Sequence, residues 1–198
     1  MYKGKKIFGL ITARAGSKRL KNKNTLKLHK KPLFYWTINE ALKSKYLDNL
    51  YISTDDKKIK EFIKNKKKIN LISRTKKLSQ DLTKSEDVVF DFIKKTKGNY
   101  DIICLLQPTS PYRRCFDIDN SIKKMINNNS KTLVSITKST KNAYKFNGAI
   151  YAVDVSFFKK KKIFFNKKTI FYKMPKSRSL DIDTKEDFKL AKKMKLIK

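Results

Sequence analysis

Short apolar runs alternate along this chain with segments whose apolar residues recur at helical spacing. Residues 6–11 and 49–54 each read as a buried strand, and residues 33–42 between them carry their apolar side chains on one helical face. Residues 101–106 are apolar at almost every position, which is typical of a central parallel strand covered on both faces. Strands that alternate with helices predict an α/β three-layer fold with a largely parallel sheet.

The rest of the chain continues this alternation. The last predicted helix follows Asp183, with Thr184 as its N-cap and Asp187 three residues on. We find no internal repeat and no low-complexity linker, and therefore expect a single domain over residues 1–198. The other expected elements are strands over 69–72, 132–136, 147–153 and 170–172, helices over 86–97 and about 117–127, and a Lys-rich turn over 157–162.

The net charge of +33 is the strongest compositional signal. A charge of this size is typical of proteins that bind nucleic acids. However, only six of the 50 basic residues are Arg, and the Lys residues are spread along the chain rather than gathered in one tail. A genome rich in A and T produces this bias without selection for a partner. We therefore expect mostly solvated basic faces, nonspecific affinity for polyanions and no specific nucleic-acid partner.

Membrane, secreted and disordered classes fit the sequence poorly. No apolar run reaches the length of a membrane span, the N-terminal run lacks a small-residue cleavage site, and 39% hydrophobic residues argue against disorder. Cys104 and Cys115 make no disulfide framework, so we expect a cytoplasmic location. His29 is the sole histidine and is expected at the surface, which argues against a catalytic triad or a histidine-based metal site.

The loop after the first strand, residues 12–24, combines small residues with a high density of cations. Its sequence, TARAGSKRLKNKN, sets Gly16 and Ser17 beside Arg14 and Lys18. Gly lets the backbone approach a ligand closely, loop N–H groups point at anionic oxygens, and Arg and Lys neutralise them. The loop matches neither the Walker A pattern nor the dinucleotide fingerprint. From its chemistry alone, a phosphate-binding loop and a solvated basic loop are equally good interpretations.

Acidic residues follow other predicted strands, at the edge where ligands of open α/β sheets bind. Asp55 and Asp56 could orient a polar ligand or cap a helix, and capping is the better interpretation from chemistry alone. Asp181 and Asp183 stand one residue apart in an extended segment. Two carboxylates so placed can approach one hard cation such as Mg²⁺, although helix capping is the more frequent role of such a pair.

The loop after the central strand carries an amide and two arginines. Gln107 begins a segment stiffened by Pro108 and Pro111, and its carboxamide can pair with a base edge as donor and acceptor together. Arg113 and Arg114 could stabilise a phosphate or form a solvated pair, and their chemistry does not separate these two interpretations.

The loop 12–24 resembles the signature loop of the CMP-sialic acid synthetases (acylneuraminate cytidylyltransferases), A-R-G-G-S-K-G-[IL]-P-x-K-N. The string LLQPTSP at 105–111 and the segment 174–183, similar to M-P-x-x-R-[SA]-x-D-I-D, extend the resemblance, whose matches run from residue 6 to about 190. In the first loop this chain departs from the family's usual Pro, Gly and Pro at Thr12, Arg19 and Lys21.

The resemblance implies a Rossmann-like nucleotidyltransferase fold with a mostly parallel central sheet. It also implies transfer of CMP from CTP to sialic acid or a related nonulosonate, with release of pyrophosphate. Mg²⁺ would be the cofactor, held by Asp181 and Asp183, and the catalytic residues would be Arg14, Lys23 and Asp183. The residues that it assigns to nucleotide binding are Ala13, Arg14, Ser17, Lys18, Lys23, Asn24, Arg74, Ser85 and Gln107.

The family's excursion for dimerisation and part of the sugar site is shortened here to residues 137–146. The implied partners are CTP and a sugar acid, with a homodimer as an option and with neither a specific nucleic acid nor a membrane. Two alternatives stay open. One is transfer of CMP to a different sugar acid, such as Kdo, pseudaminic acid or legionaminic acid. The other is a basic nucleic-acid-binding protein that keeps only the fold.

Overall fold

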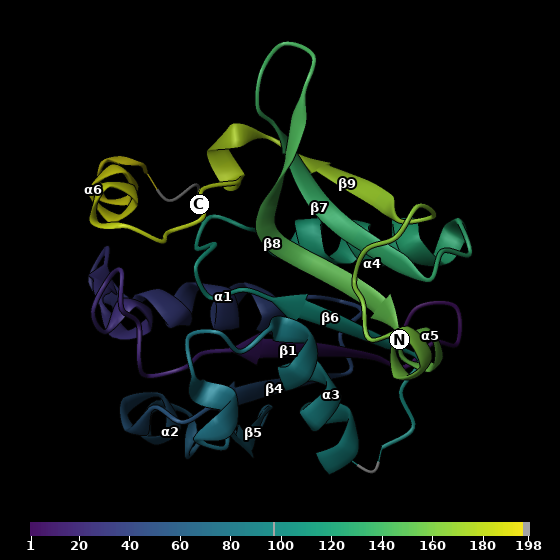
Figure 1. Cartoon of the computed structure of the whole chain (residues 1–198), viewed down its shortest axis with the longest axis horizontal. Helices are drawn as coiled ribbons and strands as arrows, with labels where there is room; N and C mark the ends of the chain where they lie inside the picture. The colour runs from purple at the N-terminus through teal and green to yellow at the C-terminus, as the bar shows by residue number, and fades with distance from the viewer. Residues whose placement is uncertain (97, 196–198) are drawn as a thin grey trace.

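A seven-stranded sheet in the order β5-β4-β1-β6-β8-β7-β9 forms the centre of the molecule (Figure 1). The structure is a computed structural model and describes residues 1–96 and 98–195. Four of the strand pairs are parallel, and β8 runs antiparallel to both of its neighbours. The prediction of a largely parallel sheet is confirmed. The strands are β1 (Ile7–Thr12), β4 (Asn49–Thr54), β5 (Ile69–Ser73), β6 (Ile102–Leu106), β7 (Thr132–Lys138), β8 (Tyr144–Asp154) and β9 (Ile170–Met174).

Helices cover both faces of this sheet, which confirms the three-layer prediction. On one face, side chains of α1, α2 and α4 pack with Ile7, Ile11 and Cys104. On the other, side chains of α3 and α5 pack with Phe8 and Leu105. The helices are α1 (Leu33–Leu42), α2 (Lys57–Ile63), α3 (Ser85–Lys95), α4 (Cys115–Asn127), α5 (Val155–Lys161) and α6 (Lys185–Lys193), with short 3₁₀ turns at Lys23–Thr25, Lys77–Ser79 and Lys176–Arg178.

The strand at the middle of the sheet, β6, is buried as its sequence indicates. Every residue of β6 is buried, and alternate side chains reach opposite cores because successive side chains of a strand point to opposite faces. Cys104 is a free, fully buried thiol in this strand, and burial raises its pKa to about 12. Cys104 therefore packs as a small hydrophobic residue.

Most elements match their predicted bounds to within a few residues, and three differences need comment. The prediction of a Lys-rich turn at 157–162 was wrong, because most of this stretch belongs to helix α5. Val155 and Phe158 bury one face of the helix, and Asp154 caps it by accepting a hydrogen bond from the Phe157 N–H at 2.9 Å. The strand expected at 147–153 is the longer β8, which forms a hairpin with β7 that projects beyond the sheet (Figure 1). The helix expected over 86–97 ends at Lys95, and Lys97 lies outside the described residues.

A small antiparallel ribbon, β2 (Lys27–Leu28) with β3 (Lys31–Pro32), follows the first loop and leads into α1. His29 lies in its turn with φ +46°. The histidine is partly exposed in this turn, and its Nε2 lies 3.5 Å from the Tyr112 Oη. The ribbon packs its Leu28 into a third apolar cluster that also contains residues of the C-terminal segment.

The C-terminal segment between β9 and α6 runs past the carboxyl edge of the sheet (Figure 1). The Ile182 N–H donates to the Thr109 carbonyl at 2.9 Å, which ties this segment to the loop after β6. Thr184 and Asp187 form the predicted capping box at the start of α6. Within residues 1–96 and 98–195, no helix combines the length and apolarity that crossing a bilayer requires.

Candidate active site

Loops that follow β1, β4 and β6 meet the C-terminal segment at one edge of the sheet. Lys23 Nζ lies 2.6 Å from Asp183 Oδ1, and the Arg19 guanidinium lies 3.2 Å from Asp183 Oδ2. These contacts join the first loop to the segment that contains Asp181 and Asp183. The carboxyl edge of a parallel sheet is where ligands of open α/β folds bind, and the sequence motifs gather there.

Asp181 is largely enclosed, and its Oδ1 finds no hydrogen-bond partner among the described residues. Burial raises the pKa of this carboxyl above its ordinary value, and the negative charge of Asp183 adds to the rise, whereas Thr109 and Lys23 oppose it. A buried oxygen without a donor is costly, so this atom is poised for a cation or a proton.

Gly148 in β8 makes the space that Asp181 occupies. Gly148 has φ +69°, and a Cβ at this position would lie 2.7 Å from the Asp181 Oδ2. A side chain here would be strained by its backbone and would also displace the carboxylate. Both the left-handed backbone and the nearby Asp181 carboxylate therefore favour glycine at this position.

Arg14 and Lys18 share one carboxylate across the opening of the first loop. Arg14 Nη1 lies 2.5 Å and Lys18 Nζ 2.8 Å from the oxygens of Asp81, and Arg14 also donates to the Gly16 carbonyl. The hydrogen bond from Lys18 and the nearby Arg14 hold the pKa of Asp81 below its usual range. A cavity of about 350 Å³ opens between these groups, lined by residues 14–18, Lys21, Asn22 and residues 79–81.

The two acids after β4 have different roles. Asp56 accepts hydrogen bonds from the Lys58 and Ile59 N–H groups and caps α2, as the capping interpretation predicted. Asp55 instead accepts from the Ala15 N–H at 2.9 Å and so fixes the first loop. Arg74 lies near this point, where burial lowers the pKa of its guanidinium and its Nε donates to the Leu78 carbonyl at 2.7 Å.

Ala13 and Asn24 support the first loop from inside. Ala13 is fully buried; its N–H donates to the Ser53 carbonyl and its own carbonyl accepts from Thr54, so its groups face the sheet. Asn24 is also buried and donates to the Arg14 carbonyl at 3.0 Å, while its Oδ1 finds no partner in the described part of the chain. Ser17, half-buried, lines the cavity beside Gly16.

Gln107 and Ser85 lie together at the other end of the site, where Gln107 Nε2 is 3.4 Å from Ser85 Oγ. Beside them is a second cavity of about 340 Å³. Sequence reasoning missed its aromatic residues, although the three apolar residues at 163–165 stand out in a Lys-rich stretch. The lining residues are Ser85, Glu86, Leu105, Gln107, Phe146, Tyr151, Ile163, Phe164 and Phe165.

Arg113 and Arg114 are not a solvated pair, so that alternative was wrong. Arg113 is 1% exposed and donates to the Gln107 carbonyl at 3.2 Å and the Ala149 carbonyl at 2.7 Å. Arg114 lies 3.2 Å from Glu40 on α1. Both arginines therefore connect elements of the fold.

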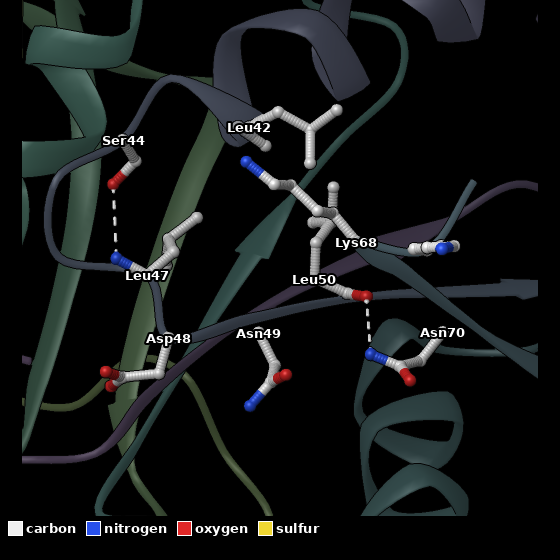
Figure 2. Close-up of a pocket in the computed structure, with 10 residues that line it drawn as sticks. Leu42, Ser44, Leu47, Asp48, Asn49, Leu50, Lys68 and Asn70 are labelled. Atoms are coloured by element: carbon white, nitrogen blue, oxygen red, sulfur yellow. Dashed lines mark hydrogen bonds between the residues drawn. The ribbon is translucent and has the colours of Figure 1, made fainter.

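A cavity of about 460 Å³ lies at the opposite edge of the sheet from this site, where β4 and β5 begin (Figure 2). The carboxylate of Asp48, which lines this cavity, already has two partners. It accepts a hydrogen bond from the Ile7 N–H at 2.8 Å and pairs with the N-terminal amine at 2.7 Å. Asn70 donates to the Leu50 carbonyl across the same hollow (Figure 2). The predicted site residues do not line this cavity, so the carboxyl edge is the better candidate.

The donor set at the carboxyl edge suits a divalent cation that brings most of its own ligands. Across the described residues, no cluster of three or more His, Cys, Asp and Glu side chains forms a closed metal cage. Asp181 and Asp183 offer two carboxylates, and the Oδ1 of Asp181 is enclosed without a donor. Mg²⁺ takes one or two protein carboxylates and completes its shell with water and substrate phosphates, so these residues fit it.

Comparison with known proteins agrees with the motifs. The sequence model of a family described as Cytidylyltransferase matches residues 8–197. N-acylneuraminate cytidylyltransferase of Streptococcus agalactiae serotype V is 30% identical over 211 residues, covering 90% of this chain and 51% of the relative. The enzyme of the same name from Escherichia coli O18:K1:H7 is 32% identical over 219 residues, covering 94% and 51%. The chain thus spans about half the length of the curated relatives it matches.

A solved structure of CMP:2-keto-3-deoxy-manno-octonic acid synthetase complexed with CTP superposes with a TM-score of 0.77 at 16% identity, covering 94% of this chain and 97% of that one. This likeness shows the fold and confirms the expected Rossmann-like nucleotidyltransferase architecture. With the family model matching almost every described residue from β1 to α6, the chain belongs to the cytidylyltransferase family.

Proposed function

We propose that this chain transfers CMP from CTP to an acidic nine-carbon sugar, a sialic acid or a related nonulosonate, and releases pyrophosphate with the help of Mg²⁺. One observation carries the proposal: the contact of Lys23 with Asp183, which sets the cation-rich first loop against the paired carboxylates. Transfer of a nucleotidyl group needs positioning and charge neutralisation more than covalent catalysis, and this edge supplies both signs of charge at close range.

The first loop would hold the triphosphate. Arg14, Lys18 and Lys23 each pair with an internal carboxylate in the structure, so phosphates would compete with Asp81 and Asp183 for these cations. Arg can grip two phosphate oxygens, whereas Lys acts as a point charge. Lys23 is the more enclosed Lys, which suits a role near the reacting α-phosphate or the leaving pyrophosphate.

Gln107 and Ser85 would contact the nucleoside. A carboxamide offers a donor and an acceptor that match one edge of cytosine, and Ser85 can adjust its hydroxyl to either. Arg74 lies close enough to Arg14 and Asp55 to interact with their charges.

The cavity beside Gln107 would take the acceptor sugar. Its walls combine the aromatic rings of Tyr151, Phe164 and Phe165 with the polar groups of Ser85 and Glu86. Aromatic rings suit the apolar faces of a sugar ring, and a few convergent polar groups fix its orientation. A sugar bound here would have its hydroxyl on the same side of the sheet as the phosphates, for in-line attack on the α-phosphorus.

Asp181 and Asp183 would hold Mg²⁺, which supplies a template and a charge sink for the triphosphate when bound. The carboxylates must be ionised for this role. Burial raises the pKa of Asp181 and so disfavours its ionised form, whereas the positive charge of Lys23 or of a bound cation favours it.

The proposal places the reaction in the cytoplasm, where CTP is supplied and where free thiols such as Cys104 and Cys115 persist.

A homodimer joined by a long arm is not part of the proposal, because β7 and β8 are connected by the five residues 139–143. Kdo remains the alternative acceptor, and the net charge of +33 keeps a polyanion-binding role as the competing class.

The test is pyrophosphate release from CTP and Mg²⁺ with a panel of sugar acids: N-acetylneuraminate, pseudaminic acid, legionaminic acid and Kdo. We expect turnover with a nonulosonate and none when CTP, the acid or Mg²⁺ is left out. Turnover with Kdo and with no other acid would show that Kdo, rather than a nonulosonate, is the acceptor. An absence of turnover with every acid, together with RNA binding that survives raised salt, would favour the nucleic-acid alternative.

A further inference from the structure

Arg113 is buried in a way that the proposed chemistry does not use. It follows the Q-P-T-S-P string and is 1% exposed, which is rare for a side chain that normally stays charged. Burial lowers the pKa of its guanidinium to about 10, although nearby Cys104, Asp117 and Glu40 oppose that effect.

The contacts described for Arg113 are both with backbone carbonyls, those of Gln107 and Ala149. Both hydrogen bonds come from Nη1, while Nε and Nη2 are enclosed and find no partner among the described residues. A buried cation with unpaired donors costs stability, and an apolar side chain of similar volume often fills such a space at lower cost. Stability alone is therefore a poor reason for an arginine here.

The two carbonyls belong to opposite ends of the site. The Gln107 carbonyl also accepts from Thr37 Oγ1 on α1 at 3.2 Å, so two donors fix the backbone from which the Gln107 carboxamide reaches Ser85. Ala149 follows Gly148, the residue whose α-carbon lies against the carboxylate of Asp181. One guanidinium thus ties the backbone at the amide end to the backbone at the carboxylate end.

We propose that Arg113 is a positioning residue that fixes the distance between Gln107, at the nucleoside end of the site, and Asp181, at the metal end. The inference rests on the proposed function, since those two roles define what is being aligned. A nucleotidyl transfer needs the base, the α-phosphorus and the metal in register, and small misplacements cost rate steeply.

The test compares the unsubstituted chain with Arg113→Met, Arg113→Lys and Thr37→Val. The readouts are kcat/KM with CTP and with UTP, the Mg²⁺ concentration that gives half the maximal rate, and the midpoint of thermal unfolding. The acceptor is the sugar acid that the wild-type chain uses best. Thr37→Val is the matched control, because it removes a donor to the Gln107 carbonyl and leaves the Ala149 carbonyl untouched.

Arg113→Met should lower kcat/KM with CTP by about 100-fold, reduce the preference for CTP over UTP about tenfold and raise the Mg²⁺ requirement about tenfold. Arg113→Lys should recover part of both effects, because an ammonium can donate to the same carbonyls. Thr37→Val should reduce only the base preference.

The inference is overturned if a folded Arg113→Met or Arg113→Lys changes only the unfolding midpoint and keeps both the base preference and the Mg²⁺ requirement. If the Met variant does not fold, the comparison of Arg113→Lys with Thr37→Val decides in the same way. A wild-type chain that turns over no sugar acid contradicts the proposed function instead, and the inference is then read from calorimetric binding of CTP and UTP with Mg²⁺.

Discussion

Lys23 and Asp183 form an ion pair at 2.6 Å, although 160 residues separate them along the chain. The contact closes the carboxyl edge of the sheet, because one partner comes from the loop after β1 and the other from the segment before α6. Such a partly enclosed pair is expensive to maintain without a function, since its charges lose part of their hydration. Its position between the phosphate-binding motif and the paired acids gives it a use in the proposed reaction.

Lys23→Met should lower kcat by about 100-fold, because the variant loses a cation that would neutralise charge developing on the phosphates. Arg19→Met is the matched control: Arg19 contacts the same carboxylate, but its side chain is 72% exposed and the Lys23 side chain only 15%. An exposed ion pair contributes little, so this control should lose less than about fivefold. Steady-state pyrophosphate release measures both, and equal losses would contradict the assignment of Lys23.

Asp181→Asn should lower Mg²⁺-dependent turnover by about 100-fold or more. The same substitution should raise the thermal stability of the ligand-free protein. The folded protein raises the pKa of this acid, so the folded state binds more protons than the unfolded state just above the ordinary Asp value. Stability is therefore lost as pH rises through the folded pKa, and the neutral amide removes that loss.

The wild-type chain should show the same titration in activity. Turnover should decline on the acid side at a pH above the ordinary range of an aspartate, because protonation of Asp181 competes with the metal. Raising the Mg²⁺ concentration should move this acid-side decline in turnover to lower pH. A decline that does not move with Mg²⁺ would show that another group controls it.

Gly148→Ala should raise the Mg²⁺ requirement, because the new Cβ would lie 2.7 Å from the Asp181 carboxylate. Gly4→Ala is a matched control: Gly4 has φ +73°, but nothing lies within 4 Å of a Cβ there. Both variants should lose about 1 kcal/mol of stability from the left-handed backbone. Only Gly148→Ala should change the Mg²⁺ titration, and a similar change in Gly4→Ala would assign the effect to strain.

Asp81→Asn should bind CTP about tenfold more tightly, since the phosphates no longer compete with a carboxylate for Arg14 and Lys18. Glu61→Gln on α2 changes the net charge equally at an exposed position and serves as the control. Calorimetry with CTP and Mg²⁺ measures the affinities. A gain of the same size in both variants would point to net charge alone.

The sequence indicates the sheet well because its central strands have unambiguous chemistry. The apolar run at 102–106 is typical of a strand buried on both faces, and the structure confirms this prediction. α5 was mistaken for a turn because its lysines dominate the composition, whereas the two buried side chains that hold it, Val155 and Phe158, are three residues apart. A short helix of this kind is fixed by tertiary packing rather than by its own propensity.

The site was predictable as a set of loops but not as a set of contacts. Lys23 and Asp183 each lie in a recognisable motif, yet their contact depends on how the last segment runs along the carboxyl edge of the sheet. Arg113 was the hardest residue to interpret, because an arginine in a polar loop gives no sign that it will be buried against two carbonyls. Burial of a charge is a property of the assembled fold.

The most direct test of the central claim is pyrophosphate release from CTP, Mg²⁺ and N-acetylneuraminate by the wild-type chain and by Asp183→Ala, with circular dichroism to confirm that both are folded. The account predicts turnover by the wild type that needs all three components, and a loss of about 100-fold or more in the variant. A folded Asp183→Ala that keeps wild-type turnover would contradict it.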